Sequence, residues 1–153
     1  MFGNTLIIDR LISSFRPEDL RTKEEDKLVL GWEQRRWVRG RFTTAKGRKI
    51  GIALPTGTTL APDSALWIGP DWYLKIEAAT ESVLEITPGE YEHAVKIAFE
   101  VGNRHFPLAI QQGKIVVPDD KAMVRLMDRL NASWERRQMI FDPIGSTQQH
   151  QHG

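Results

Sequence analysis

Two stretches in the second half of the chain carry apolar residues at the spacing of one helical face, and this pattern most limits the available folds. Apolar residues occupy positions i, i+3, i+4 and i+7 from Ala94 to Val101 and again from Met123 to Leu130. Short apolar segments typical of strands precede, separate and follow the two stretches. The order strand, helix, strand, strand, helix, strand predicts a ferredoxin-like βαββαβ domain with both helices on one face of an antiparallel sheet.

The first half of the chain predicts only strands. Apolar and polar residues alternate with a period of two from Leu28 to Trp32, and further strand candidates span residues 5–12, 37–43 and 49–54. The charged run of residues 23–27 is typical of a solvated loop. Short strands with frequent turns favour a small β-sandwich or barrel. The predicted fold class is therefore α+β.

These patterns divide the chain into three parts. We expect residues 1–79 to form an all-β N-terminal domain and residues 80–145 to form the ferredoxin-like domain. Residues 146–153 are polar and low in complexity, so we expect a disordered tail, which contains His150 and His152.

Charge and composition exclude several classes of function. The formal net charge of +1 gives no reason to expect nucleic-acid binding by the whole molecule. No apolar run approaches the roughly 20 residues that span a bilayer, and no signal-peptide pattern opens the chain, so we expect a cytoplasmic protein without a membrane partner. Because the chain has no cysteine, disulfides, thiolate zinc sites and thiol catalysis are excluded.

His105 lies where the first predicted helix gives way to a strand. Gly102 is predicted to end the helix, because glycine enters the left-handed region without a clash, and Asn103 tolerates the same region. In a chain without cysteine, a neutral imidazole is the best available ligand for a borderline metal ion. The spacing alone leaves two interpretations open, an ordinary junction residue or a metal ligand.

The motif at this junction resembles that of the UreE family, the urease accessory proteins that bind nickel and pass it to urease; it reads Phe99-Glu100-x-Gly102-Asn103-Arg104-His105. Residues 28–33, 51–58 and 76–81 also resemble family segments, although Thr56 stands where many members carry arginine. The resemblance implies a peptide-binding-like β-domain followed by a ferredoxin-like domain for metal binding and dimerisation. It further implies a nickel metallochaperone rather than an enzyme, with His105 paired with its own copy across a homodimer.

The chain departs from the family pattern at two places. Many members carry histidine beside the aspartate that opens the second helix, but here Asp119 and Lys121 flank Asp120, which argues against a second internal metal site. Many members also end in a long histidine-rich tail, whereas this tail has only His150 and His152. The resemblance therefore implies a protein built for nickel transfer and not for storage.

Two His105 imidazoles alone would leave a Ni²⁺ ion incompletely coordinated. His150 and His152 on the tail could complete the site, so the predicted metal ligands are His105, His150 and His152. Zn²⁺ and Cu²⁺ are expected to compete, because affinity alone does not select nickel. Binding should weaken as the pH falls through roughly 6.5, since histidine must be neutral to ligate. The implied partners are the urease apoprotein and its accessory GTPase.

Other residues have simpler interpretations. His93 is expected on the surface of a helix, Asp119 and Asp120 are expected to cap a helix, and Met123 and Met127 are expected in the core or the dimer interface. An alternative function, a small RNA- or peptide-binding module, rests on arginines interleaved with tryptophans at Arg35, Arg36, Arg39, Arg41, Trp32 and Trp37. A hydrolase is disfavoured, because neither a Gly-x-Ser-x-Gly turn nor a His-Glu-x-x-His helix occurs.

Overall fold

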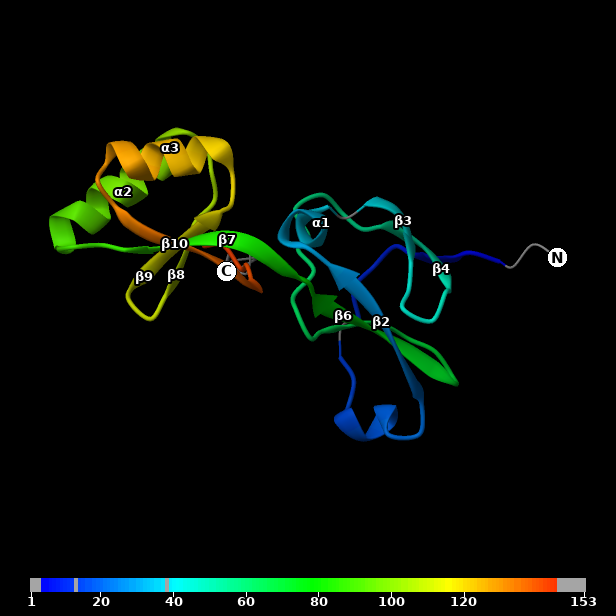
Figure 1. The fold of residues 1–153 in the computed structure, drawn as a ribbon. Coiled ribbons are helices and arrows are strands. Elements are labelled where there is room, and N and C mark those ends of the chain that lie inside the picture. Colours follow the sequence, from blue (N-terminus) through cyan, green and yellow to red (C-terminus); the bar gives the residue numbers. More distant parts are fainter. Residues whose placement is uncertain (1–3, 13, 38, 146–153) are drawn as a thin grey trace, which may run out of the picture. The chain divides into compact units, whose positions relative to one another are not determined.

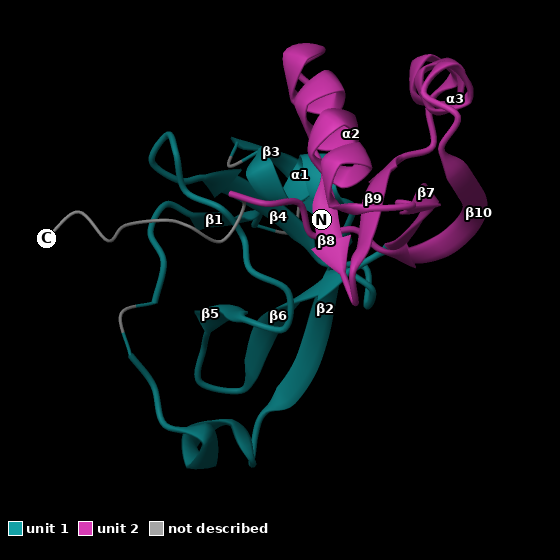
Figure 2. Cartoon of the chain, turned by 90° about the vertical axis from the view of Figure 1, so that its left-hand side faces the viewer, with its two compact units in different colours: residues 1–79, 149–153 teal, residues 80–148 magenta. Residues whose placement is uncertain are grey.

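The computed structural model describes residues 4–12, 14–37 and 39–145 of the 153-residue chain. The chain forms two compact units, the first ending at Ala79 and the second beginning at Thr80 (Figure 2). Most of the regular elements of the first unit are strands, and the second unit combines strands with two helices, so the predicted α+β class is confirmed. No helix among these residues is long and apolar enough to cross a membrane.

The first unit contains two three-stranded sheets. In one sheet the strand order is β1–β4–β3, and in the other it is β2–β6–β5. In each sheet one pair of strands is parallel, β1 with β4 and β2 with β6. The strands are β1 (Leu6–Ile8), β2 (Glu24–Leu30), β3 (Arg39–Thr43), β4 (Lys49–Ala53), β5 (Ala65–Ile68) and β6 (Trp72–Ala78), and the helices are the 3-10 helix η1 (Pro17–Leu20) and α1 (Trp32–Arg36) (Figure 1).

One apolar core joins the two sheets of the first unit. Ile50 and Ile52 of β4 lie in the same buried cluster as Leu74 and Ile76 of β6, and each is at most 3% exposed. Burial of such side chains contributes about 1.5–3 kcal/mol each, before the entropy cost of ordering them. The first unit is therefore a small β-sandwich, one of the two architectures predicted.

Two local predictions for the first unit are wrong. The charged run at residues 23–27 is not a loop, because β2 begins at Glu24 and pairs along its length with β6. The strand predicted to continue to Trp32 ends at Leu30, and the short helix α1 begins at Trp32 instead. Gln34 stabilises this start by accepting a hydrogen bond from the backbone N–H of Gly31 at 3.0 Å.

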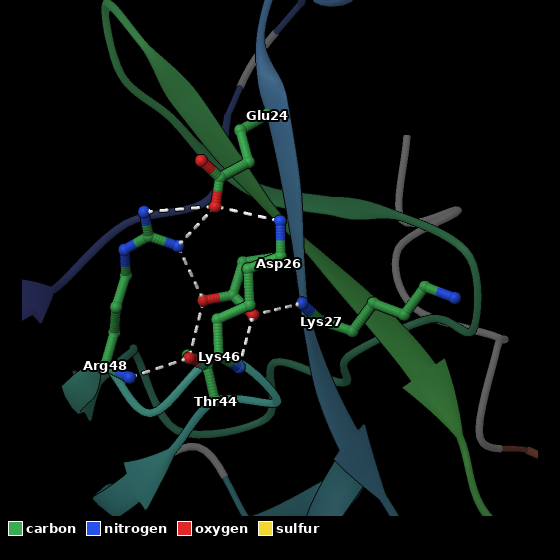
Figure 3. A network of polar contacts seen from close by, with 6 residues as sticks. All are labelled: Glu24, Asp26, Lys27, Thr44, Lys46 and Arg48. Carbon is green, nitrogen blue, oxygen red and sulfur yellow. Dashed lines mark hydrogen bonds and ion pairs between the residues drawn. The ribbon is translucent and has the colours of Figure 1, made fainter.

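A polar network explains why a charged segment can form β2 (Figure 3). Asp26 is only 1% exposed, and its carboxylate accepts hydrogen bonds from the Thr44 hydroxyl, the Arg48 guanidinium and the backbone N–H groups of Lys27 and Lys46. Burial acts to raise the pKa of Asp26, but these hydrogen bonds outweigh burial and lower it. The buried charge is thus satisfied, and it ties β2 to the turn between β3 and β4.

The second unit has the predicted ferredoxin-like topology. Its sheet has the strand order β10–β7–β9–β8, and every neighbouring pair is antiparallel. Figure 1 shows both helices on one face of this sheet. The elements in chain order are β7 (Thr80–Thr87), α2 (Tyr91–Asn103), β8 (Ala109–Gln111), β9 (Lys114–Pro118), α3 (Lys121–Arg129) and β10 (Ser133–Ile140).

The core of the second unit lies between the helices and the sheet. Ile97 and Val101 of α2 and Met123 and Met127 of α3 are fully buried, in a cluster that also contains sheet residues such as Ile86. Met123 and Met127 are therefore core residues, which is one of the two positions that the sequence predicted for them. The helical spacing in the sequence identified these inward-facing positions correctly.

After β10 the chain crosses the sheet. β10 and β8 are the two edges of the sheet, yet the backbone N–H of Ile144 donates a hydrogen bond of 2.8 Å to the carbonyl of Leu108, just before β8. Phe141 is 1% exposed, and Pro143 is buried as well. The last described residues therefore lie beside Leu108, three residues after His105.

Candidate metal centre

His105 lies in the turn directly after α2, and its own backbone is left-handed, with φ of 60°. The predicted position of the left-handed residue is wrong. Gly102 and Asn103 remain inside the helix, neither has a positive φ, and Arg104 forms the C-cap. The helix thus ends later than predicted, and the unusual conformation falls on the candidate ligand itself.

Two hydrogen bonds define this helix end as a Schellman motif. The N–H of His105 donates to the carbonyl of Gly102 at 2.9 Å, and the N–H of Phe106 donates to the carbonyl of Val101 at 3.2 Å. Phe106 also packs against the core cluster that contains Val101. These contacts fix the backbone on both sides of His105 while leaving its side chain exposed.

A left-handed backbone costs a residue with a Cβ atom about 1 kcal/mol, a cost that glycine avoids and asparagine largely tolerates. The end of α3 shows the usual solution. Asn131, with φ of 53°, occupies the same place there, and the N–H of Ala132 donates to the carbonyl of Met127 at 2.9 Å. A histidine in this place is a local strain that the requirements of the turn do not explain.

Arg104 reinforces the end of α2. Its guanidinium donates to the Glu100 carbonyl at 3.0 Å and forms an ion pair with the Glu100 carboxylate one turn earlier. A cation at a helix C-terminus also interacts favourably with the helix dipole. The sequence shows Glu100 and Arg104 at helical i, i+4 spacing, so this pair could have been predicted from the spacing.

An apolar stripe on α2 leads toward the His105 turn. Tyr91, Val95 and Phe99 follow one another at intervals of four residues, so they share a face of the helix. Their exposed fractions are 82%, 51% and 65%. Three large apolar residues on one exposed helix face are typical of a surface that another protein covers.

Of the three predicted ligands, only His105 lies among the described residues. His150 and His152 lie outside the described residues, and among the described residues no group of three or more His, Asp or Glu side chains could hold a metal ion. Within the described part of the chain, His105 is thus an exposed imidazole on a fixed turn that belongs to no such group. One such ligand cannot form a tight site by itself.

Two of the other candidate residues have structural roles. His93 accepts a hydrogen bond from the Gly89 N–H through Nδ1 at 3.4 Å, and its Nε2 lies 3.0 Å from the Leu130 carbonyl, so both ring nitrogens are engaged. Asp120 caps α3 by accepting from the Ala122 N–H, as predicted.

Asp119 does not cap α3 and binds Arg136 and the Ser82 hydroxyl instead. Hydrogen bonds from Arg136 and then from Ser82 lower the pKa of Asp119.

The arginines in the arginine-rich segment of the first unit lie in different environments, although they are close together in the sequence. Arg35 is 2% exposed, and its guanidinium donates to the Leu30 carbonyl at 3.0 Å, so this arginine belongs to the interior. Arg36 lies over the ring of Trp32 at 5.7 Å. Among the six residues of the alternative function, Arg36, Arg39, Arg41 and Trp37 are exposed and could form a binding surface.

Comparison with known proteins assigns both units to the same family. The model of the UreE urease accessory protein C-terminal domain matches residues 81–153, and the model of the N-terminal domain matches residues 8–79. Proteins named urease accessory protein UreE are similar along most of the chain. The protein of Lysinibacillus sphaericus is 26% identical over 96% of this chain and 100% of its own length. That of Rhodobacter capsulatus is 30% identical over 84% and 83%, and that of Cupriavidus necator is 28% identical over 97% and 79%.

Proposed function

Because the chain belongs to the UreE family of urease accessory proteins, we propose that two copies of it hold one Ni²⁺ ion between their His105 side chains and deliver the ion for assembly of the urease active site. The observation that carries this proposal is the left-handed backbone of His105. Strained residues that the surrounding structure holds in place cluster at functional sites. In this role the protein carries an ion and catalyses no reaction.

The exposed stripe on α2 supports a two-fold dimer. In an isologous interface the same surface patch of both subunits meets, so a residue near the axis faces its own copy. Contact through Tyr91, Val95 and Phe99 would bury apolar surface and bring together the two helix ends that carry His105. Residues 80–145 would then form the metal-binding and dimerisation domain.

The tail would supply further ligands. Ile144 is hydrogen-bonded to Leu108, which lies three residues after His105, and an extended chain spans about 3.4 Å per residue. His150, five residues beyond Gly145, can therefore extend about 17 Å from the end of the described chain. This reach allows His150 and His152 to approach the His105 turn of their own subunit.

A site of this kind suits a carrier. Two imidazoles on fixed turns and two on a tail can bind an ion firmly and still give it up, unlike a structural zinc site with four fixed ligands. The same imidazoles accept Zn²⁺ and Cu²⁺, so selection of nickel would depend on the supply of metal ions and on the partners. Those partners would be the urease apoprotein and its accessory GTPase.

Calorimetric titration with Ni²⁺, combined with a solution mass, tests the proposal. The expected result is one tightly bound ion per two chains, lost in His105→Ala with a drop in affinity of more than about a hundredfold, beyond the 10–100-fold typical of an outer-shell partner. His93→Gln is the matched control, because it removes the other imidazole of the described chain. Unchanged nickel affinity in His105→Ala would contradict the proposal.

A further inference from the structure

The strand β3 is an open edge of the sheet β1–β4–β3. Among the described residues β3 pairs only with β4, so alternate backbone N–H and C=O groups point away from the sheet without a strand partner. Natural proteins usually blunt such an edge or use it to bind an extended segment of another chain. Figure 1 shows β3 and β4 as the two arms of one hairpin.

The outer face of this sheet carries three cationic side chains. The register sets Arg39 opposite Ala53, Arg41 opposite Gly51 and Thr43 opposite Lys49, while Phe42 alternates inward opposite the buried Ile50. Arg39, Arg41 and Lys49 therefore share the face that points away from the core.

These cations lack the partners that neutralise the neighbouring Arg48, which pairs with Asp26 and Glu24. Within the described part of the chain, no carboxylate lies within ion-pair distance of the side-chain nitrogens of Arg39, Arg41 or Lys49. Asp9, which follows β1, is paired with Arg10. The positive charge of this face is thus available to an outside partner.

A cavity of about 300 Å³ crosses the same strands. Its lining includes Thr5, Arg41, Thr43 and Lys49, and the Lys49 ammonium donates to the Thr43 hydroxyl at 3.0 Å. A guanidinium, an ammonium and hydroxyl groups around one hollow are suited to bind a carboxylate. Just before β3, Trp37 is 71% exposed and offers an apolar surface at the start of the same edge.

We propose that β3 and the cationic face beside it dock an acidic, extended segment of a partner protein. The segment pairs its backbone with the open edge of β3, and its carboxylates lie on Arg39 and Arg41, with one of them in the cavity beside Lys49. A protein strand fits better than single-stranded RNA, because the open edge offers backbone pairing and only one exposed tryptophan offers a base a stacking surface. This docking surface uses no residue of the proposed nickel site.

Amide NMR of the full-length protein, labelled with ¹⁵N, provides the test. The probes are a capped peptide of alternating valine and glutamate, the same peptide with lysine for glutamate, an N-methylated form that cannot pair its backbone, and a short oligouridylate. The expected result is that the valine–glutamate peptide shifts the β3 amides and the Trp37 indole signal, while the lysine and N-methylated peptides do not. Stronger binding of oligouridylate, or equal binding of the N-methylated peptide, would overturn the proposal.

Charge reversal makes the test specific. The double variant Arg39→Glu, Arg41→Glu should weaken the valine–glutamate peptide by about tenfold or more and should gain binding of the valine–lysine peptide. The control is Arg125→Glu, Arg129→Glu, which reverses two exposed charges on α3 and should leave both peptides unaffected. Equal losses in the two double variants would show a nonspecific charge effect and would contradict a site at β3.

Discussion

The two helices of the second unit end in the same motif but place different residues at its left-handed position. At the end of α3 this residue is Asn131, which tolerates the conformation well, and at the end of α2 it is His105, for which the conformation is less favourable. Both ends have the same pair of backbone hydrogen bonds, so the fold requires nothing of His105 that asparagine or glycine would not supply. From this difference we expect the residue at position 105 to serve a role other than ending a helix, as the proposed nickel site requires.

The side-chain contacts around the two helix ends also differ. The end of α3 is closed, because its Leu130 carbonyl lies at hydrogen-bond distance from His93 and the Trp134 indole donates to Asp128 one turn back. The end of α2 adjoins an exposed apolar stripe and the chain segment anchored at Leu108. The end of α3 is thus held by side-chain contacts, whereas the end of α2 exposes the side chain of His105.

Met127→Ala should have the largest effect, a loss of stability without a change in nickel binding by the folded protein. Met127 is fully buried at the end of α3, and truncation of such a side chain costs about 2–5 kcal/mol of unfolding free energy. Denaturant unfolding at fixed protein concentration measures this loss. Nickel stoichiometry of the protein that remains folded should not change; a loss below about 1 kcal/mol would contradict the structural role assigned to this helix end.

Mild acid should weaken nickel binding without unfolding the protein. Imidazoles ordinarily protonate near 6.5, so nickel affinity should fall by about tenfold or more between roughly pH 7.5 and 5.5. The pKa values of Asp26 and Asp119 are lowered, so their stabilising contribution is present above their ordinary value of 3.8 and is lost only as the pH falls below it. Circular dichroism at each pH is the control, and flat nickel affinity would argue for carboxylate ligands.

Removal of residues 147–153 should weaken nickel binding at the end of α2 and leave the end of α3 unchanged. Loss of His150 and His152 should weaken nickel binding by about tenfold, while one ion per dimer remains, because the paired His105 residues stay on their fixed turns. Titration calorimetry compares the truncated and full-length chains. A truncated protein that binds no nickel would make the tail the primary site and would remove the functional distinction between the two helix ends.

Replacing the left-handed residue of each helix end by glycine should have the smallest effect on stability, and it compares the two helix ends directly. His105→Gly should raise the unfolding free energy by about 0.5–1 kcal/mol, because glycine adopts the left-handed backbone without strain, while abolishing tight nickel binding. Asn131→Gly should change stability by only a few tenths of a kcal/mol and leave nickel binding intact. Denaturant titration of the two variants without metal measures both changes; equal stabilisation would mean that His105 is not strained.

Much of the second unit could be predicted from the sequence, because each of its elements is amphipathic and local. The helical spacing of the two stretches and the short strands around them were sufficient to specify the ferredoxin-like topology, and His105 was correctly placed at the junction between helix and strand. The exact end of α2 was not predictable from residue type. Gly102 and Asn103 are the usual residues for a helix end, yet the bonds of the turn place that end at Arg104 and His105.

The first unit was harder to predict, because its charged residues are satisfied by partners far away in the chain. Glu24 and Asp26 lie in a run that is typical of a loop, and only contacts with Thr44, Lys46 and Arg48 make a strand possible there. The anchoring of Ile144 to Leu108 is equally invisible in the sequence, since a single backbone hydrogen bond has no side-chain signature. Long-range pairing was the missing information in both cases.

The parallel strand pairs of the first unit have a consequence for how the chain folds. Leu6 pairs with Ile50 and Glu24 with Trp72, so each parallel pair closes a loop of more than forty residues before its contacts can form. In the second unit, by contrast, β8 and β9 are joined by a tight hairpin. We therefore expect the first unit to fold more slowly, and a chain emerging from the ribosome cannot complete its N-terminal sandwich until β6 has been synthesised.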